Sequence, residues 1–326
     1  MRTIDEITKS VSAVFVGVPD VFAVVLMGSC SRGEETWRTA EDGNRELMSD
    51  YEFTIFLKNM NPQTISLLDN RLTELNLHLK MSTNSPFFSL EWNYFHAKRV
   101  PFIDKRFINF EMKAAKYLIY GNDAIFKLMP SISVKNINIS ELMSVINHRL
   151  YHVLRDLNSI GDHEKKYLIA RNTLDIPSVV LPLEGDLICS YKKRITVFID
   201  KKYDYFFENE LGSRLLNCYL MKRDYSSELY QKVNVNEMLD FFIKDMMKLH
   251  DYMCFKHHGN AFVIDKRRLL KACLKCNIRQ TISVINRPNE EEELYQYMLD
   301  RLQSGQMRDD ELEKLKCHMR QIYSYC

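Results

Sequence analysis

The stretch from Met27 to Leu57 limits the possible folds of this 326-residue chain more than any other part of its sequence. It begins where an apolar run, Phe22 to Met27, ends in Gly28-Ser29, and it closes with a second apolar run, Phe53 to Leu57. Short runs of β-branched and aromatic residues between turn formers are typical of strands. We therefore expect two strands that are joined by a polar loop.

Two acidic residues stand at the head of the second predicted strand. Asp50 and Glu52 are two positions apart, and side chains alternate between the faces of a strand, so both carboxylates point the same way. Two such carboxylates are costly unless positive charge lies between them, and a divalent cation with oxygen ligands supplies that charge. The tight turn at Gly28-Ser29 offers backbone N–H groups that suit phosphate oxygens.

An apolar run, Gly-Ser, a loop, and acid-x-acid on the next strand make the chain resemble the nucleotidyltransferase superfamily that includes DNA polymerase β. The residues that match this pattern are Gly28, Ser29, Asp50 and Glu52. Arg32-Gly33 stands where many members carry Arg-Gly, and the resemblance covers roughly residues 1–130. Two features depart from the pattern: the loop after Ser29 is longer than in the small members, and the second acid is Glu rather than Asp.

The superfamily places a third acid on a later strand, and two glutamates of this chain compete for that role. A helix predicted from Pro62 to about Lys80 leads to a third predicted strand, residues 87–95, which contains Glu91. Glu111 comes before a fourth predicted strand and turn, residues 117–123. We prefer Glu91 as the third acid, although it could instead be an ordinary exposed residue of the strand. Glu111 remains the competing candidate.

The resemblance implies an enzyme that moves a nucleoside monophosphate from a nucleoside triphosphate to an acceptor hydroxyl or phosphate and releases pyrophosphate. It implies that Asp50, Glu52 and Glu91 are catalytic and hold two Mg²⁺ or Mn²⁺ ions, one activating the attacking group and one gripping the triphosphate. Gly28 and Ser29 would bind the β- and γ-phosphates.

Three further residues are candidates for nucleotide binding. Arg32, in the loop from Cys30 to Ser49, is near enough in sequence to reach a triphosphate, and a solvated loop charge is the simpler reading. The helical part of such enzymes commonly supplies a base-stacking aromatic and a lysine for the triphosphate. Tyr191 and Lys192 are our candidates, and their alternative reading is an ordinary helix surface with extended lysines.

The second half of the chain has an almost wholly helical pattern. A polar tract after Pro130 indicates a boundary, and the helices that we expect span residues 141–157, 164–180, 186–198, 237–255, 266–276, 290–303 and 309–323. The prediction is an α+β protein of two domains. An N-terminal nucleotidyltransferase domain with a mixed sheet and flanking helices covers residues 1–135, and a C-terminal helical bundle covers residues 136–326.

The charge balance bears on the partners of the protein. Lys and Arg number 45 against 43 Asp and Glu, so no strong field favours nucleic acid or a membrane surface. We therefore expect a nucleoside triphosphate and a small-molecule acceptor such as a sugar or an antibiotic, with no stable nucleic-acid partner and no membrane. The N-terminus has no signal region, and no apolar run approaches ~20 residues, so we expect a cytoplasmic protein.

Other readings stay open beside this one. The product could be a cyclic or linear oligonucleotide, as in antiphage-defence enzymes, or an adenylylated protein, and the domain could be a non-catalytic nucleotide sensor. A structural Zn²⁺ site is a further option, with ligands Cys254, His257, Cys273 and Cys276. The segment that holds the last two cysteines reads as one amphipathic helix, so we favour a packing role for them.

Overall fold

A computed structural model describes residues 3–258 of the chain, except residues 41–42, 84–86, 157–159, 204–206 and 208–209. The described chain divides into two compact units. The first unit contains residues up to Ile137 together with two later segments, Asp186–Thr196 and Tyr219–Ser227. The second unit contains the rest of the described chain. The fold class is α+β, as predicted.

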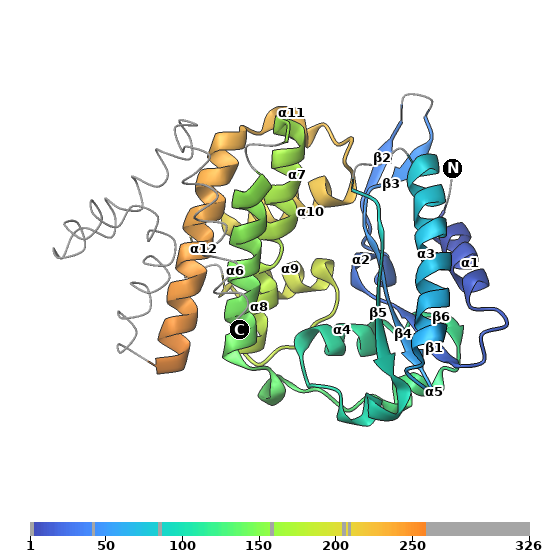
Figure 1. Cartoon of the computed structure of the whole chain (residues 1–326). Helices are drawn as coiled ribbons and strands as arrows, with labels where there is room; N and C mark the ends of the chain where they lie inside the picture. Colours follow the sequence, from blue (N-terminus) through green and yellow to red (C-terminus); the bar gives the residue numbers. More distant parts are fainter. Residues whose placement is uncertain are drawn as a thin grey trace, which may run out of the picture. The chain divides into compact units, whose positions relative to one another are not determined.

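A mixed four-stranded sheet forms the centre of the first unit (Figure 1). Its strands lie in the order β5-β4-β1-β6, and their bounds are β1 Val21–Leu26, β4 Tyr51–Leu57, β5 Leu90–His96 and β6 Leu118–Gly121. Strand β1 pairs antiparallel with both β4 and β6, and β4 pairs parallel with β5. A parallel pair needs a crossover, and helix α3, Pro62–Thr83, supplies it. All four predicted strands are confirmed.

Hydrophobic cores cover both faces of this sheet. On one face, helix α1, Ile4–Val14, lies beside α3, and both pack on the alternate residues Phe53 and Ile55 of β4 (Figure 1). On the other face, Phe56 packs in a second core. The short elements around this second core are η1 Ala97–Phe102, α4 Phe107–Ala115 and α5 Ala124–Leu128. Because β4 is covered on both sides, its apolar run is nearly continuous rather than alternating.

The polar segment after Ser29 contains more regular structure than the loop that the sequence predicts. A short helix α2, Gly28–Ser31, follows β1 directly. Strands β2, Trp37–Thr39, and β3, Arg45–Leu47, then form an antiparallel two-stranded sheet. These strands are too short for a period of two to be visible in the sequence.

The described secondary structure of the second unit is helical, and its main helices are α6 Ile139–Asp156, α7 Asp162–Thr173, α8 Ile176–Leu183, α11 Leu229–Lys232 and α12 Val235–His258. Helix α12 packs on α6, α7 and α8. Helices α9, Tyr191–Asp200, and α10, Leu211–Arg223, each have residues in both units. No described helix has both the length and the apolar composition that crossing a membrane requires.

Two helix predictions need correction. The helix predicted over residues 164–180 is two helices, α7 and α8, because the chain turns at Leu174-Asp175. Asp175 accepts hydrogen bonds from Arg149 and Ser178 there. Helix α9 begins at Tyr191 rather than residue 186. The helices predicted at residues 266–276, 290–303 and 309–323 lie outside the described residues.

Candidate active site

Two adjacent parallel strands bring the three predicted acids to the same end of the sheet. Glu52 in β4 lies opposite Glu91 in β5, and Asp50 immediately precedes β4. Because β4 and β5 run in the same direction, their N-terminal ends lie side by side. The sequence does not show this pairing register, which places Glu91 next to the acid-x-acid pair.

Ser89 lies between two of these acids. Its Oγ is 3.3 Å from Oδ1 of Asp50 and 3.2 Å from Oε1 of Glu91. A hydroxyl carries one proton, so Ser89 can donate to only one of these carboxylates at a time. Asp50 and Glu91 are therefore close neighbours, and Glu91 is exposed to solvent on its strand.

Gly28 and Ser29 lie against the same acids. Gly28 has a φ of 64°, which favours glycine, and a Cβ atom there would be 2.6 Å from Oε2 of Glu52, so a larger residue would displace this carboxylate. The Ser29 hydroxyl donates to Oγ of Ser49 at 3.4 Å, one residue before Asp50. Gly28 thus lies against Glu52, and Ser29 contacts the residue before Asp50.

The chemistry of the three acids suits a magnesium or manganese ion, because these hard cations prefer oxygen ligands. In the part of the chain that the structure describes, no group of three or more His, Cys, Asp or Glu side chains is arranged to hold a metal ion. The Glu52 carboxylate lies against Gly28, whereas Asp50 and Glu91 reach Ser89. The carboxylate oxygens are of the kind that such an ion prefers, but the three side chains would have to rotate before they could bind the same ion.

The proposed zinc ligands cannot be located in the same way. Cys273 and Cys276 lie outside the described residues, and the side chains of Cys254 and His257 are not described either. The zinc site therefore stays a hypothesis from the sequence.

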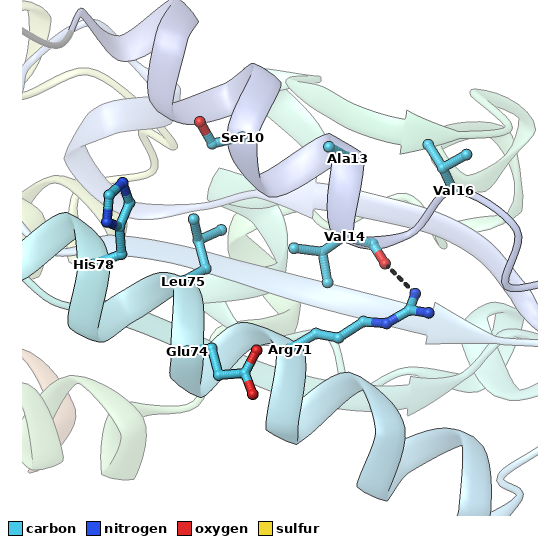
Figure 2. A pocket seen from close by; sticks show the side chains of 8 residues that line it. All are labelled: Ser10, Ala13, Val14, Val16, Arg71, Glu74, Leu75 and His78. Carbon is cyan, nitrogen blue, oxygen red and sulfur yellow. Dashed lines mark hydrogen bonds between the residues drawn. The ribbon is translucent and has the colours of Figure 1, made fainter.

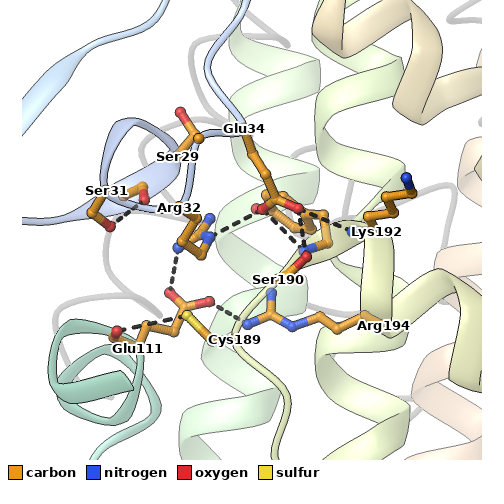
Figure 3. A network of polar contacts seen from close by, with 12 residues as sticks. Ser29, Ser31, Arg32, Glu34, Glu111, Cys189, Ser190, Lys192 and Arg194 are labelled. Atoms are coloured by element: carbon orange, nitrogen blue, oxygen red, sulfur yellow. Dashed lines mark hydrogen bonds and ion pairs between the residues drawn. The ribbon is translucent and has the colours of Figure 1, made fainter. Parts of the chain in front are cut away.

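The side chain of Arg32 is buried, so the expectation that it is a solvated charge on a loop is wrong. Its side chain is 5% exposed, with Nε 3.1 Å from Oε2 of Glu34 and Nη1 3.3 Å from Oε2 of Glu111 (Figure 3). Burial alone lowers the pKa of Arg32, but the nearby carboxylates, Glu111 foremost, outweigh burial and raise it above the usual arginine value. Arg32 therefore stays charged inside a network of ion pairs.

Glu111, the competing third acid, belongs to this network. It lies in α4 and forms ion pairs with the guanidinium groups of both Arg32 and Arg194 (Figure 3). Arg194 is 1% exposed, and its guanidinium also lies 4.8 Å from the centre of the Phe107 ring. Glu111 is therefore the counter-ion of two buried arginines, whereas Glu91 is near Asp50 through Ser89.

Tyr191 and Lys192 form the first turn of α9. The Tyr191 ring is contacted by two guanidinium groups, with the central carbon of Arg32 5.1 Å and that of Arg194 5.2 Å from the ring centre. The Lys192 side chain is exposed. The network thus contains the side chains of Arg32 and Tyr191 and the main chain of Lys192.

Glu34 also belongs to this network, although no sequence pattern indicated a role for it. It is 3% exposed, and its carboxylate accepts hydrogen bonds from the backbone N–H groups of Tyr191 and Lys192, each at 3.0 Å. Burial raises the pKa of Glu34, but these donors and the Arg32 charge outweigh burial and lower it. No local spacing signals this role, because its partners lie in a distant part of the sequence.

A separate hollow of about 580 Å³ lies between α1 and α3 (Figure 2). It is lined by Ser10, Ala13, Val14, Val16, Arg71, Glu74, Leu75 and His78. Arg71 donates a hydrogen bond to the Val14 carbonyl at 3.0 Å. None of the predicted site residues lines this hollow, so it is distinct from the acid set.

No protein-family model, curated protein or solved structure matches this chain. The functional proposal therefore depends on the geometry of the residues described above.

Proposed function

We propose that the protein is a metal-dependent nucleotidyltransferase, which moves a nucleoside monophosphate from a nucleoside triphosphate to an acceptor and releases pyrophosphate. The observation that carries this proposal is the strand register, which sets Glu52 opposite Glu91 and places Asp50 directly before β4, beside Gly28 and Ser29. The order of strand, Gly-Ser turn, acid pair, crossover helix and third acid also supports it.

In this proposal the three acids hold Mg²⁺ or Mn²⁺, which would neutralise the triphosphate and activate the acceptor hydroxyl. Asp50 and Glu52, at the head of β4, would bind the metal ions. The exposed Glu91 would accept the proton of the acceptor hydroxyl. Gly28 and Ser29 bind the outer phosphates through backbone N–H groups and the serine hydroxyl. Catalysis of this kind depends on positioning and on charge neutralisation rather than on a covalent intermediate.

We propose a small molecule, such as a sugar or an antibiotic, as the acceptor. The net charge of +2 over 326 residues provides no strong field for a polyanion such as nucleic acid. The oligonucleotide, protein and sensor alternatives predict different labelled products, so one assay can separate them.

The test incubates the protein with each α-³²P-labelled nucleoside triphosphate and Mg²⁺ or Mn²⁺, with and without a metabolite extract. We expect pyrophosphate release and a new labelled species, both absent from the Asp50→Asn/Glu52→Gln variant. The matched control is Glu46→Gln, because Glu46 is an acid of the same segment that pairs with Arg38 on the β2–β3 hairpin. Metal-dependent binding without turnover in any extract would indicate the sensor, and the absence of metal-dependent nucleotide binding would overturn the proposal.

A further inference from the structure

The backbone of Glu34 is tied to the Gly-Ser turn. Its N–H group donates to the Ser29 carbonyl at 2.9 Å, and the N–H group of Arg32 donates to the same carbonyl at 3.2 Å. The ammonium group of Lys222 donates to the carbonyl of Glu34. The main chain of Glu34 therefore has a fixed position relative to Ser29.

The side chain of Glu34 is tied to the start of helix α9. Oε1 accepts from the Ser190 hydroxyl at 2.8 Å and from the Lys192 N–H group at 3.0 Å, and Oε2 accepts from the Tyr191 N–H group at 3.0 Å. The first N–H groups of a helix have no partner within the helix, so a carboxylate there satisfies them and also interacts favourably with the helix dipole. Figure 3 shows these bonds converging on the Glu34 carboxylate.

We infer that Glu34 is a positioning residue for nucleotide binding. It links Ser29 to Lys192, since its N–H group bonds to one residue and its carboxylate bonds to the other. This inference depends on the proposed function, in which Ser29 binds the triphosphate, and on the prediction from the sequence that Lys192 also contacts it. A lysine side chain is flexible, so a fixed main chain reduces the entropy that binding must remove.

The ion pairs around Glu34 support the same role. Arg32 bonds to Glu34 and to Glu111, and Glu111 in turn pairs with Arg194 in α9. These contacts form a second connection between the segment after Ser29 and α9. The positive charges compensate the carboxylates within the network, so the Lys192 ammonium is not needed as a counter-ion for Glu34.

The first experiment measures amide hydrogen exchange in the first turn of α9. Glu34→Gln replaces one acceptor oxygen by an NH₂ group that faces N–H donors, so exchange at Tyr191 and Lys192 should become about 10-fold faster or more. Glu46→Gln should leave both amides unchanged. Should Glu34→Gln fail to fold, Ser190→Ala removes one donor to the carboxylate and should give a smaller change in the same direction at Tyr191, whose N–H group bonds to Glu34. The Lys193 amide is left out of this comparison because it bonds to the Ser190 hydroxyl itself. Unchanged exchange in these variants would overturn the inference.

The second experiment uses calorimetry to measure the affinity for inorganic tripolyphosphate with Mg²⁺. This probe contains the triphosphate chain that all nucleoside triphosphates share. Glu34→Gln and Lys192→Met should each weaken binding by about 10-fold, and the double variant should be no weaker than Lys192→Met alone. Additive losses, or unchanged affinity in Glu34→Gln, would overturn the inference.

The two readouts separate this inference from the proposed function. If the wild-type protein binds neither tripolyphosphate nor any nucleoside triphosphate, the proposed function fails and the substrate role of Glu34 fails with it. Amide exchange would still show whether Glu34 holds the first turn of α9. If the wild type binds the probe and exchange in Glu34→Gln is unchanged, the proposed function stands and the positioning role alone is wrong.

Discussion

Replacement of Gly28 by alanine tests the contact between the Gly-Ser turn and the acid pair. Gly28 has a φ of 64°, and Gly17, which lies between α1 and β1, has a φ of 77° and serves as the matched control. A new Cβ at Gly17 meets nothing within 4 Å, whereas at Gly28 it lies 2.6 Å from Oε2 of Glu52. The two variants thus share the backbone conformation and differ in the contact with a proposed metal ligand.

The expected magnitudes follow from these two differences. An alanine in the left-handed region costs about 1–2 kcal/mol, so both variants should lose this much free energy of unfolding. The Glu52 carboxylate is the far end of a flexible side chain, and it can move away from the new methyl group at little further cost in stability. A displacement of about 1 Å at a reacting centre costs roughly 100-fold in rate, so only Gly28→Ala should lose transferase activity on this scale.

Urea unfolding followed by tryptophan fluorescence is the assay for stability. Both tryptophans of the chain, Trp37 and Trp92, lie in the first unit, so their emission reports on the unit that contains the site. Pyrophosphate release at saturating nucleotide measures activity. The reasoning is refuted if Gly28→Ala retains the turnover of Gly17→Ala, or if it loses several kcal/mol more stability than the control.

The remaining predictions concern the other acids and the buried thiols. Glu91→Gln should lower transfer by about 100-fold or more and leave the unfolding midpoint unchanged, because Glu91 is exposed. Glu111→Gln should instead destabilise the first unit by about 3 kcal/mol, because two buried guanidinium groups lose their counter-ion. If Glu111 were the third acid, Glu111→Gln rather than Glu91→Gln would abolish transfer without changing the unfolding midpoint. The lowered pKa of Glu34 stabilises the folded state above the ordinary carboxyl pKa, and this contribution is lost as pH falls through the folded value. Wild-type unfolding midpoints should therefore fall more steeply below about pH 4 than those of Glu34→Gln, and parallel curves would contradict the shift. Burial raises the pKa of Cys218 to about 12 and also raises that of Cys30, so neither should react with iodoacetamide at pH 8 before unfolding. Peptide mass spectrometry would detect any label on them in the native protein.

The sequence identified the elements whose signal is local. The apolar runs that became β1 and β4 and the segment that became α3 depend on residues within a few positions of one another. The positions of Asp50 and Glu52 at the head of β4 follow from the same runs. These features need no knowledge of what packs against them.

Elements that depend on distant contacts were not visible in the same way. The β2–β3 hairpin has strands of three residues each, and Thr39 at its edge bonds to Ser226. At the turn between α7 and α8, the side chain of Asp175 accepts a hydrogen bond from Arg149 in α6. The late start of α9 coincides with the Ser190 and Glu34 contacts at its first turn. In each case a side-chain or strand contact decides where the regular element begins or ends.

The amino-acid sequence by itself determined the acid pair, the Gly-Ser turn and the strands that hold them, because these follow from alternation and turn chemistry within short stretches. Only the tertiary structure decided that Glu91 stands opposite Glu52, that Glu111 is a counter-ion, and that Glu34 links Ser29 to Lys192. For Glu91 the physical reason is that strand register depends on the packing of the paired strands. For Glu111 and Glu34 it is that a buried charge must find a partner in space, and that partner has no fixed distance along the chain.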